Sequence, residues 1–260
     1  LSSNDGIIVA LTPEAKAVGL HRGDALFKVK EIVERNRVTV FSTNMYLYNA
    51  MSKRIVSILR QACDRVETYS IDESFLDLRG YEKNYNLEGY MRDVADRIRL
   101  WTDVPVSVGI APTKTLAKMG SKFAKNYKGY HSVCVIDSDC KRRKALALFE
   151  LDDVWGIGRR TYEKLISLGV RTPLEFADKP AEWVHRHLTK PGFQPWRELN
   201  GHPCINTEEV LQRQSICTSH CFKDMVSSLD ALKASVATFA GSCANKLRGQ
   251  GSVAACVSVF

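Results

Sequence analysis

Two adjacent acids, Asp72 and Glu73, lie inside an apolar and β-prone stretch that runs from Tyr69 to Gly80. Burying an isolated carboxylate among apolar side chains is costly, and two neighbouring carboxylates repel each other unless a cation neutralises them. Hard oxygen ligands of this kind suit Mg²⁺. The pair therefore favours a local fold in which the two acids share a divalent cation.

The position of the two acids between strand-forming runs predicts where such a site would lie. Neighbouring residues of a strand point to opposite faces, so two adjacent acids converge on one ion only at a bend or a hairpin end. The runs at 66–71 and 74–78 read as two strands, with the acids between them. The alternative is a turn with both side chains in water, because Asp-Glu is a common dipeptide in turns.

Composition limits the classes of protein to which the chain can belong. A chain of 260 residues, 45% hydrophobic and 25% charged, is globular and long enough for two or more domains. Its formal charge of +8 favours an acidic partner such as nucleic acid. No stretch approaches the roughly 20 apolar residues of a membrane span, and no signal peptide is visible, so we expect a cytoplasmic protein. Eight cysteines without a Cys-x-x-Cys pair argue against a zinc ribbon or a disulfide framework.

Helix and strand patterns alternate through the first half of the chain. Thr12 and Pro13 are typical of a helix start, and Gly19 of a helix end. The alternation predicts an α/β or α+β domain that ends with the strand at 132–136. The other expected elements are a turn at 3–6, a strand at 7–11, helices at 44–63 and 90–101, and a strand at 104–110.

A helix rich in lysine is expected after Pro112. At 100° per residue its lysines fall on one side and its apolar residues on the other, and no acid occurs from 112 to 130. A solvated face normally mixes charges, so this pattern suits a polyanion or a triphosphate; a solubilising outer face is the alternative. The lysines are Lys114, Lys118, Lys122, Lys125 and Lys128, opposite Leu116, Met119, Phe123 and Tyr127.

A Gly156-Ile157-Gly158 turn followed by Arg159 and Arg160 precedes a helix expected at 161–168. Such a turn leaves backbone N–H groups free at a helix start, where they can bind a phosphate without reading base sequence. We interpret the segment as a helix-hairpin-helix, with a tight helical hairpin that binds nothing as the alternative. Further along, strands at 214–222 and 252–260 are expected around a helix ended by Gly249, as the first part of a domain with too little core to stand alone.

Several stretches of the chain, taken together in their order along the sequence, resemble the Y-family translesion DNA polymerases. The resemblance is closest to the UmuC group. That group comprises the catalytic subunit of bacterial DNA polymerase V and its plasmid-borne relatives. The resemblance implies an α+β and α/β multidomain fold of the right-hand polymerase type: fingers at 1–43, palm at 44–137, helix-hairpin-helix thumb at 138–205 and the start of a little finger at 206–260. The matching stretches are 3–6, 14–19, 47–48, 51–52, 69–77, 109–118 and 152–160.

The resemblance also implies DNA-templated nucleotidyl transfer with two Mg²⁺ ions. Asp72 and Glu73 match the second and third metal-binding carboxylates of the family. The first catalytic Asp, with the aromatic residue that excludes ribonucleotides, is expected before Leu1, so the fragment is expected to be a poor catalyst. Pro13 occupies a position that is often Tyr in other branches. The remaining implied site residues are Lys16 and Lys125 on the triphosphate, and Gly156, Gly158, Arg159 and Arg160 on DNA.

Partners implied by the resemblance are primer-template DNA, a deoxynucleoside triphosphate, a UmuD′-type dimer, a recombinase filament and a sliding clamp. The setting would be the SOS response to DNA damage, at the bacterial nucleoid. Two other functions are considered. One is a catalytically inactive DNA-binding relative that serves as a scaffold, and the other is a nucleotidyl cyclase, which shares a palm-like topology and two-metal chemistry.

Overall fold

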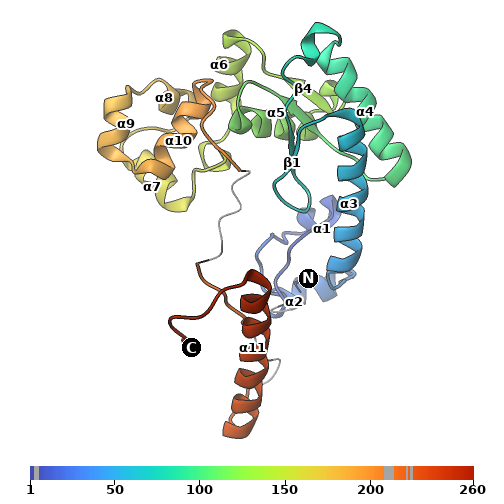
Figure 1. Cartoon of the computed structure of the whole chain (residues 1–260), viewed down its shortest axis with the longest axis vertical. Helices are drawn as coiled ribbons and strands as arrows, with labels where there is room; N and C mark the ends of the chain where they lie inside the picture. The colour runs from blue at the N-terminus through green and yellow to red at the C-terminus, as the bar shows by residue number, and fades with distance from the viewer. Residues whose placement is uncertain (3–5, 208–213, 221, 223–224) are drawn as a thin grey trace. The chain divides into compact units, whose positions relative to one another are not determined.

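The computed structural model describes residues 1–2, 6–207, 214–220, 222 and 225–260. The chain forms two compact units (Figure 1). The smaller unit comprises residues 1–45 and 210–260, and the larger comprises residues 46–209. The acidic pair, the lysine-rich helix and the glycine turn all belong to the larger unit.

The N-terminal part of the smaller unit contains helix α1 (Pro13–Ala17), a 3₁₀ turn η1 (Leu26–Lys28) and helix α2 (Lys30–Arg35). The Thr12 hydroxyl accepts a hydrogen bond from the Ala15 N–H at 3.3 Å, which confirms the predicted helix start. The strand expected at 7–11 is wrong. A strand needs a hydrogen-bonded partner, and only Ile7 makes an isolated bridge, to Ala25. Of the turn expected at 3–6, residues 3–5 lie outside the described residues.

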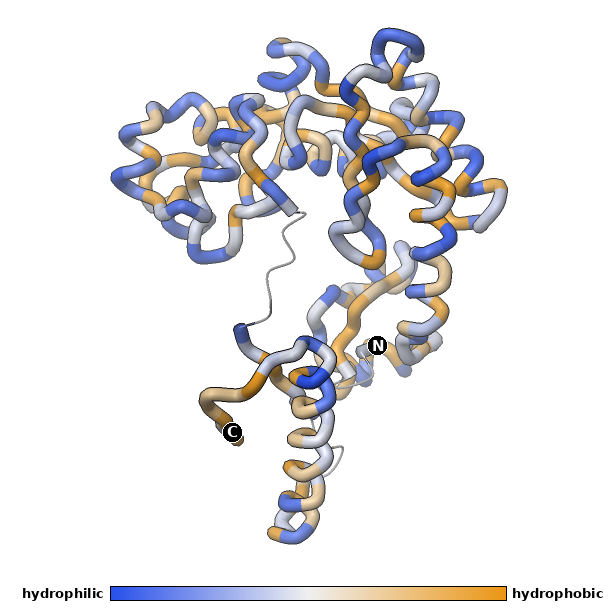
Figure 2. The backbone as a smooth tube through the Cα atoms, viewed as in Figure 1, coloured by the Kyte–Doolittle hydropathy of each residue, from blue (hydrophilic) through white to orange (hydrophobic). Residues whose placement is uncertain are grey.

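The C-terminal part of the smaller unit is dominated by helix α11 (Leu229–Gln250), which ends at Gly251 with a φ of 68°. The strands expected at 214–222 and 252–260 are wrong for the residues that are described there, since none of them pairs into a sheet. The His220 ring instead stacks on Phe239 of α11, with centroids 5.9 Å apart. Hydrophobic residues occur along α11 and in the segment between α11 and the last residue (Figure 2). Phe260, the last residue, is fully exposed.

The larger unit begins with helices and two small sheets, and it continues with helices alone. The predicted helices at 44–63 and 90–101 are confirmed, and the four predicted strands form over fewer residues each. In chain order the elements are α3 (Met45–Ala62), β1 (Val66–Thr68), β2 (Ser74–Leu76), η2 (Tyr81–Lys83), α4 (Leu87–Thr102), β3 (Val108–Ile110), α5 (Lys114–Asn126), η3 (Lys128–Tyr130), β4 (Val133–Val135), α6 (Asp139–Leu148), η4 (Leu151–Asp153), α7 (Arg159–Ser167), α8 (Pro173–Ala177), α9 (Ala181–His187) and α10 (Lys190–Leu199).

The two sheets have two strands each. β1 and β2 are antiparallel, with Val66 opposite Leu76 and Thr68 opposite Ser74, so the chain between them forms a hairpin turn. β3 and β4 are parallel, and α5 is the crossover helix that joins them. A core cluster under these strands contains Ile58 of α3, Met91, Val94 and Ile98 of α4, and Val133 of β4.

Glycine allows α5 to lie directly against β3. A Cβ atom on Gly109 would lie 1.8 Å from the Ala117 carbonyl oxygen and 2.4 Å from the Ser121 nitrogen, both backbone atoms of α5. On the helix side, a Cβ on Gly120 would lie 3.1 Å from the Gly109 Cα. The backbones of the helix and the strand therefore touch, which sets the face that α5 presents to its other neighbours.

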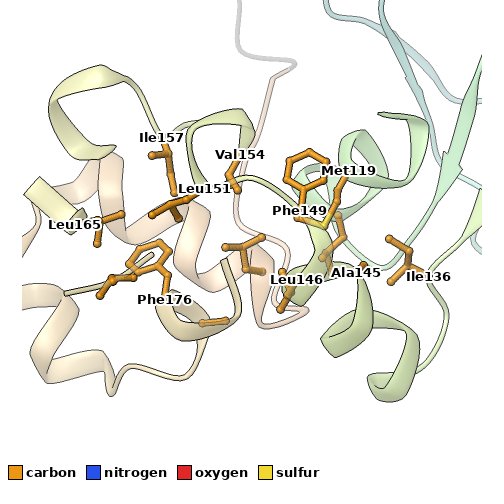
Figure 3. Packing of buried hydrophobic residues seen from close by; sticks show 14 of the residues in the cluster. Met119, Ile136, Ala145, Leu146, Phe149, Leu151, Val154, Ile157, Leu165 and Phe176 are labelled. Carbon is orange, nitrogen blue, oxygen red and sulfur yellow. The ribbon is translucent and has the colours of Figure 1, made fainter. Parts of the chain in front are cut away.

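A second core continues from α5 through α6, α7 and α8 to α10 (Figure 3). Met119 of α5 packs in the same cluster as Leu146 and Phe149, and the cluster extends to Leu165 and the fully buried Phe176. The apolar residues predicted for α5 at positions 116, 119 and 123 are buried here, whereas Tyr127 is exposed. The helical region from α6 to α10 is thus packed on the lysine-rich helix by continuous apolar contact.

A buried carboxylate connects the start of α5 to the chain that follows α10. Glu198 is 1% exposed, and its Oε2 accepts a hydrogen bond from the Thr115 N–H at 2.9 Å. Its Oε1 accepts from the backbone N–H groups of Cys204 at 2.7 Å and Ile205 at 3.2 Å. A negative charge at a helix N-terminus is favourable, so Glu198 stabilises α5 while it holds residues 204–205 in place.

Replacing Glu198 with glutamine should lower the free energy of unfolding by about 1–3 kcal/mol, because the amide turns an N–H toward a buried backbone N–H that then lacks an acceptor. Urea unfolding followed by circular dichroism measures the change. Glu182→Gln on the exposed surface of α9 is the control and should change stability little. Equal stability of the two variants would contradict the anchoring role of Glu198.

Among the described residues, no helix is long and apolar enough to cross a membrane.

Candidate active site

The acidic pair lies in the turn of the β1–β2 hairpin. The backbone N–H groups of Tyr69 and Ser70 both donate to the Glu73 carbonyl oxygen at 3.0 Å, which closes the turn. The Ser70 hydroxyl donates to Asp72 Oδ1 at 2.6 Å, and both acids are exposed. The acids therefore lie at a hairpin turn, as predicted, and the exposure of both side chains agrees with the alternative of a turn whose acids face water.

Lys118 of α5 reaches the turn and binds Glu73. Its Nζ lies 2.8 Å from Glu73 Oε1 and 2.9 Å from Oε2, so both carboxylate oxygens accept from one ammonium group. The same Nζ lies over the rings of Tyr69, at 5.2 Å from the centroid, and Trp155, at 5.0 Å. The Lys118 side chain is only 25% exposed, whereas that of Glu73 is 43% exposed.

Two more lysines of α5 are paired with acids of other elements. Lys114 Nζ lies 2.6 Å from Glu67 Oε2 on β1 and 2.7 Å from the Thr207 hydroxyl. Lys122 pairs with Asp153 of η4. The sequence showed no acid within the helix, but it could not show that three of the five lysines are neutralised from elsewhere.

Lys125 differs from the lysines that precede it on α5. It is exposed and forms no ion pair among the described residues. It is therefore a cation of α5 that remains available to an anionic ligand. Lys16, the other residue expected on a triphosphate, is exposed on α1 of the smaller unit.

An aromatic cluster attaches the acidic turn to the glycine turn. Tyr69 and Phe75 come from the hairpin, and Trp155 immediately precedes Gly156. Ring centroids lie 5.3 Å apart for Tyr69 and Trp155 and 5.7 Å apart for Phe75 and Trp155. The indole N–H of Trp155 also donates to the Tyr69 hydroxyl at 3.3 Å. We did not expect this role of Trp155 from the sequence, where its only signal was its place beside the glycine motif.

The glycine turn has a structural role. Gly156 has a φ of 91°, which favours glycine, and a Cβ there would lie 2.6 Å from Pro195 Cγ. Backbone conformation and packing therefore both require glycine at this position. Gly158 is the N-cap of α7, has no side-chain cap and has open space around it. Helix α7 begins at Arg159, two residues before the expected start, so Arg159 and Arg160 lie in its first turn. Arg159 donates to Glu163 at 2.8 Å.

An ion-pair network closes the other end of the hairpin. Asp77 follows β2, and its carboxylate accepts from the guanidinium groups of Arg79 and Arg65. The hydrogen bond from Arg79 holds the pKa of Asp77 well below its usual range. A carboxyl whose pKa falls on folding contributes stability above its unfolded pKa of about 3.9 and loses that contribution as the pH falls.

Arg79→Gln should therefore destabilise the protein at pH 7, and the difference from the wild-type protein should narrow as the pH falls from 5 toward 2. Urea unfolding of both proteins at several pH values measures this dependence. Arg99→Gln, at an exposed position of α4 with no ion pair among the described residues, is the control. A difference for Arg79→Gln that stays constant with pH would rule out the Asp77 interaction as its cause.

The oxygen donors of the acidic turn fit a hard divalent cation. The carboxylates of Asp72 and Glu73 are both reachable from solvent, so no apolar side chains need to move for an ion to approach them. Within the described parts of the chain, no group of three or more His, Cys, Asp or Glu residues could hold a metal ion. Asp72 and Glu73 are thus two exposed acids that lie next to each other in the turn.

Comparison with known proteins establishes the family. Residues 1–122 match the impB/mucB/samB family model, and residues 213–260 match the model of the C-terminal domain of the same family. The chain belongs to this family. It is 36% identical to protein ImpB of Salmonella typhimurium, 37% identical to protein UmuC of Salmonella typhimurium and 35% identical to protein MucB of Escherichia coli, in each case over its whole length. The chain spans 62% of the length of these relatives.

Solved structures show the same fold. The chain matches a Dbh DNA polymerase in an insertion ternary complex with a TM-score of 0.63 and 24% identity, over 75% of this chain and 56% of that one. It matches DinB from Sulfolobus solfataricus with a TM-score of 0.59 and 26% identity, over 72% of this chain and 53% of that one. The predicted fold class, that of the Y-family DNA polymerases, is confirmed.

Proposed function

We propose that the chain forms part of a DNA-directed DNA polymerase that carries out translesion synthesis in the repair of damaged DNA. The main support is that the acidic turn, the lysine-rich helix and the glycine turn are joined by direct contacts within one unit. Glu73 contacts Lys118, and Tyr69 contacts Trp155 beside Gly156. Membership of the impB/mucB/samB family points to the same activity.

In this proposal Asp72 and Glu73 hold the divalent cations, two Mg²⁺ ions in the full site. Bound there, the ions would stabilise the negative charge that develops as a phosphoryl group is transferred. The turn orients the carboxylates, because its own backbone hydrogen bonds and the Ser70 hydroxyl fix the direction of Asp72. Lys125 and Lys16 are assigned to the triphosphate of the incoming nucleotide, since both are exposed cations.

The duplex would be held through its phosphates at the start of α7. The uncapped N–H groups after Gly158 and the side chains of Arg159 and Arg160 provide donors that do not read base sequence. Binding of this kind weakens as salt is added, because each phosphate contact releases counterions. We therefore assign Gly156, Gly158, Arg159 and Arg160 to DNA binding in a helix-hairpin-helix thumb at residues 138–205.

The proposal extends to the cellular setting. The finger, palm and little-finger boundaries at 1–43, 44–137 and 206–260 follow the family pattern. The expected setting is the SOS response, at the nucleoid in the cytoplasm. The expected partners are a UmuD′-type dimer, a recombinase filament and a sliding clamp.

Primer extension by the intact protein tests the proposal. The template carries an abasic site, and the assay is run with and without Mg²⁺. Extension past the lesion that requires Mg²⁺ supports the assignment. Binding of primer-template DNA without any extension would indicate the inactive scaffold, and conversion of nucleoside triphosphates to cyclic products without DNA would indicate a cyclase.

A further inference from the structure

Lys118 occupies the carboxylate that the proposed function gives to a divalent cation. Both Glu73 oxygens accept hydrogen bonds from its ammonium group, at 2.8 and 2.9 Å. The ammonium group also lies over the faces of two aromatic rings, Tyr69 and Trp155, which attract a cation. Lys118 is thus held in one place by three neighbours, and one of them is an acid expected to bind metal.

We propose that Lys118 and a divalent cation exclude each other on Glu73, so that Lys118 controls the metal affinity of the acidic turn. The inference rests on the proposed function, because it takes Glu73 as a metal ligand. Without the ion, Lys118 neutralises Glu73 and keeps the carboxylate directed toward α5. When an ion binds, Glu73 releases the ammonium group, which the rings of Tyr69 and Trp155 still retain nearby. Lys118 is a positioning residue in this scheme.

Electrostatics set the direction of the effect. A cation that approaches Glu73 must displace a lysine that already satisfies both oxygens, and it meets the repulsion of the same positive charge. Removing the lysine charge should therefore strengthen cation binding in two ways. No ammonium group has to be displaced from Glu73, and its repulsion of the cation is gone. The aromatic rings keep Lys118 beside the turn, so the competition does not depend on a freely moving side chain.

The helix contains a matched control at Lys122. This lysine lies one turn further along α5, pairs with Asp153 and lies over the Phe149 ring at 5.1 Å. It resembles Lys118 in charge, helix and surroundings, yet its ion pair is with Asp153 and not with Asp72 or Glu73. A general effect of removing one positive charge from α5 would appear equally in both lysine variants.

The test measures Mn²⁺ binding directly, by the electron paramagnetic resonance signal of free Mn²⁺. The proteins are wild type, Lys118→Met, Lys122→Met, Glu73→Gln and the double variant Glu73→Gln with Lys118→Met. We expect Lys118→Met to bind Mn²⁺ at least about fivefold more tightly than wild type. Lys122→Met should stay within about twofold of wild type, since distance and solvent screen its charge. The gain should vanish in the double variant, and thermal melting verifies that each protein is folded.

The outcomes separate the inference from the proposed function. If Glu73→Gln binds Mn²⁺ as tightly as wild type, Glu73 is no metal ligand and the metal role in the proposed function fails. If Glu73→Gln weakens binding but Lys118→Met does not tighten it, the exclusion by Lys118 is wrong while the metal site stands. An equal gain in both lysine variants would also overturn the inference.

Tryptophan fluorescence gives a second readout that does not depend on variants of Lys118. Release of the ammonium group from Glu73 changes its position over the Trp155 ring, so Mg²⁺ should alter the emission of the wild-type protein. Trp155→Phe removes the reporter while the other tryptophans remain, and it should abolish the change. Metal binding through Glu73 with no change in Trp155 emission would show that Lys118 does not move, and would contradict the proposal.

Discussion

Replacing Asp72 with asparagine should reduce the rate of primer extension by the intact protein about 10²–10³-fold. Loss of one charge-stabilising group aimed at a transition state typically costs about 3–4 kcal/mol. Asparagine keeps the size of the side chain and its side-chain oxygen can still accept from Ser70, so the turn should keep its shape. Single-turnover extension at saturating nucleotide measures the chemical step without the contribution of binding.

Asp137→Asn is the control for the Asp72 variant. Asp137 is also an exposed acid of the larger unit, and it pairs with Lys141 away from the acidic turn. This variant should extend the primer at the wild-type rate. Wild-type extension by Asp72→Asn itself would show that the hairpin turn carries no catalytic carboxylate.

Replacing Gly109 with alanine should lower the free energy of unfolding by more than about 3 kcal/mol. The cause is a steric clash rather than a loss of backbone flexibility. The added Cβ would meet two backbone atoms of α5 at 1.8 and 2.4 Å, and backbone cannot rotate away as a side chain can. Overpacking in a core typically costs about 1–3 kcal/mol, and a backbone clash lies at or above the top of that range. Because α5 carries Lys118, a displaced helix should also lose the contact with Glu73.

Urea unfolding and thermal melting measure the effect of Gly109→Ala. Gly129→Ala is the matched control, because a Cβ at that glycine meets nothing within 4 Å and its φ is ordinary. The control should melt at nearly the wild-type temperature. Equal stability of the two variants would show that α5 and β3 do not lie in backbone contact.

Local signals in the sequence predicted the elements of the larger unit well. The apolar period of α5, like the Thr12 cap in the smaller unit, depends on residues within one or two turns of each other, so both can be read from a short window. The strands expected at 7–11, 214–222 and 252–260 did not form among the residues described there, because strand formation depends on a partner that a short window does not contain. Apolar and β-branched residues favour a strand, but a strand forms only where another strand offers a ladder of hydrogen bonds.

The candidate site was predictable in its parts but not in its connections. Asp72 and Glu73 were recognised because adjacent acids in an apolar stretch are unusual, and the lysines because no acid accompanies them in their helix. Nothing local indicated that Lys118 binds Glu73, 45 positions earlier in the chain, or that Trp155 packs on Tyr69, 86 positions earlier. Glu198 was missed because a glutamate near the end of a helix carries no sign that it is buried.

The sequence by itself determined which chemistry the chain carries: two neighbouring carboxylates, a row of lysines, a glycine turn and the family to which these motifs belong. The tertiary structure decided which of these groups neutralise each other. Charge pairing acts between atoms a few ångströms apart, and only the packing of α5 on β3, through Gly109 and Gly120, brings Lys118 within reach of the acidic turn.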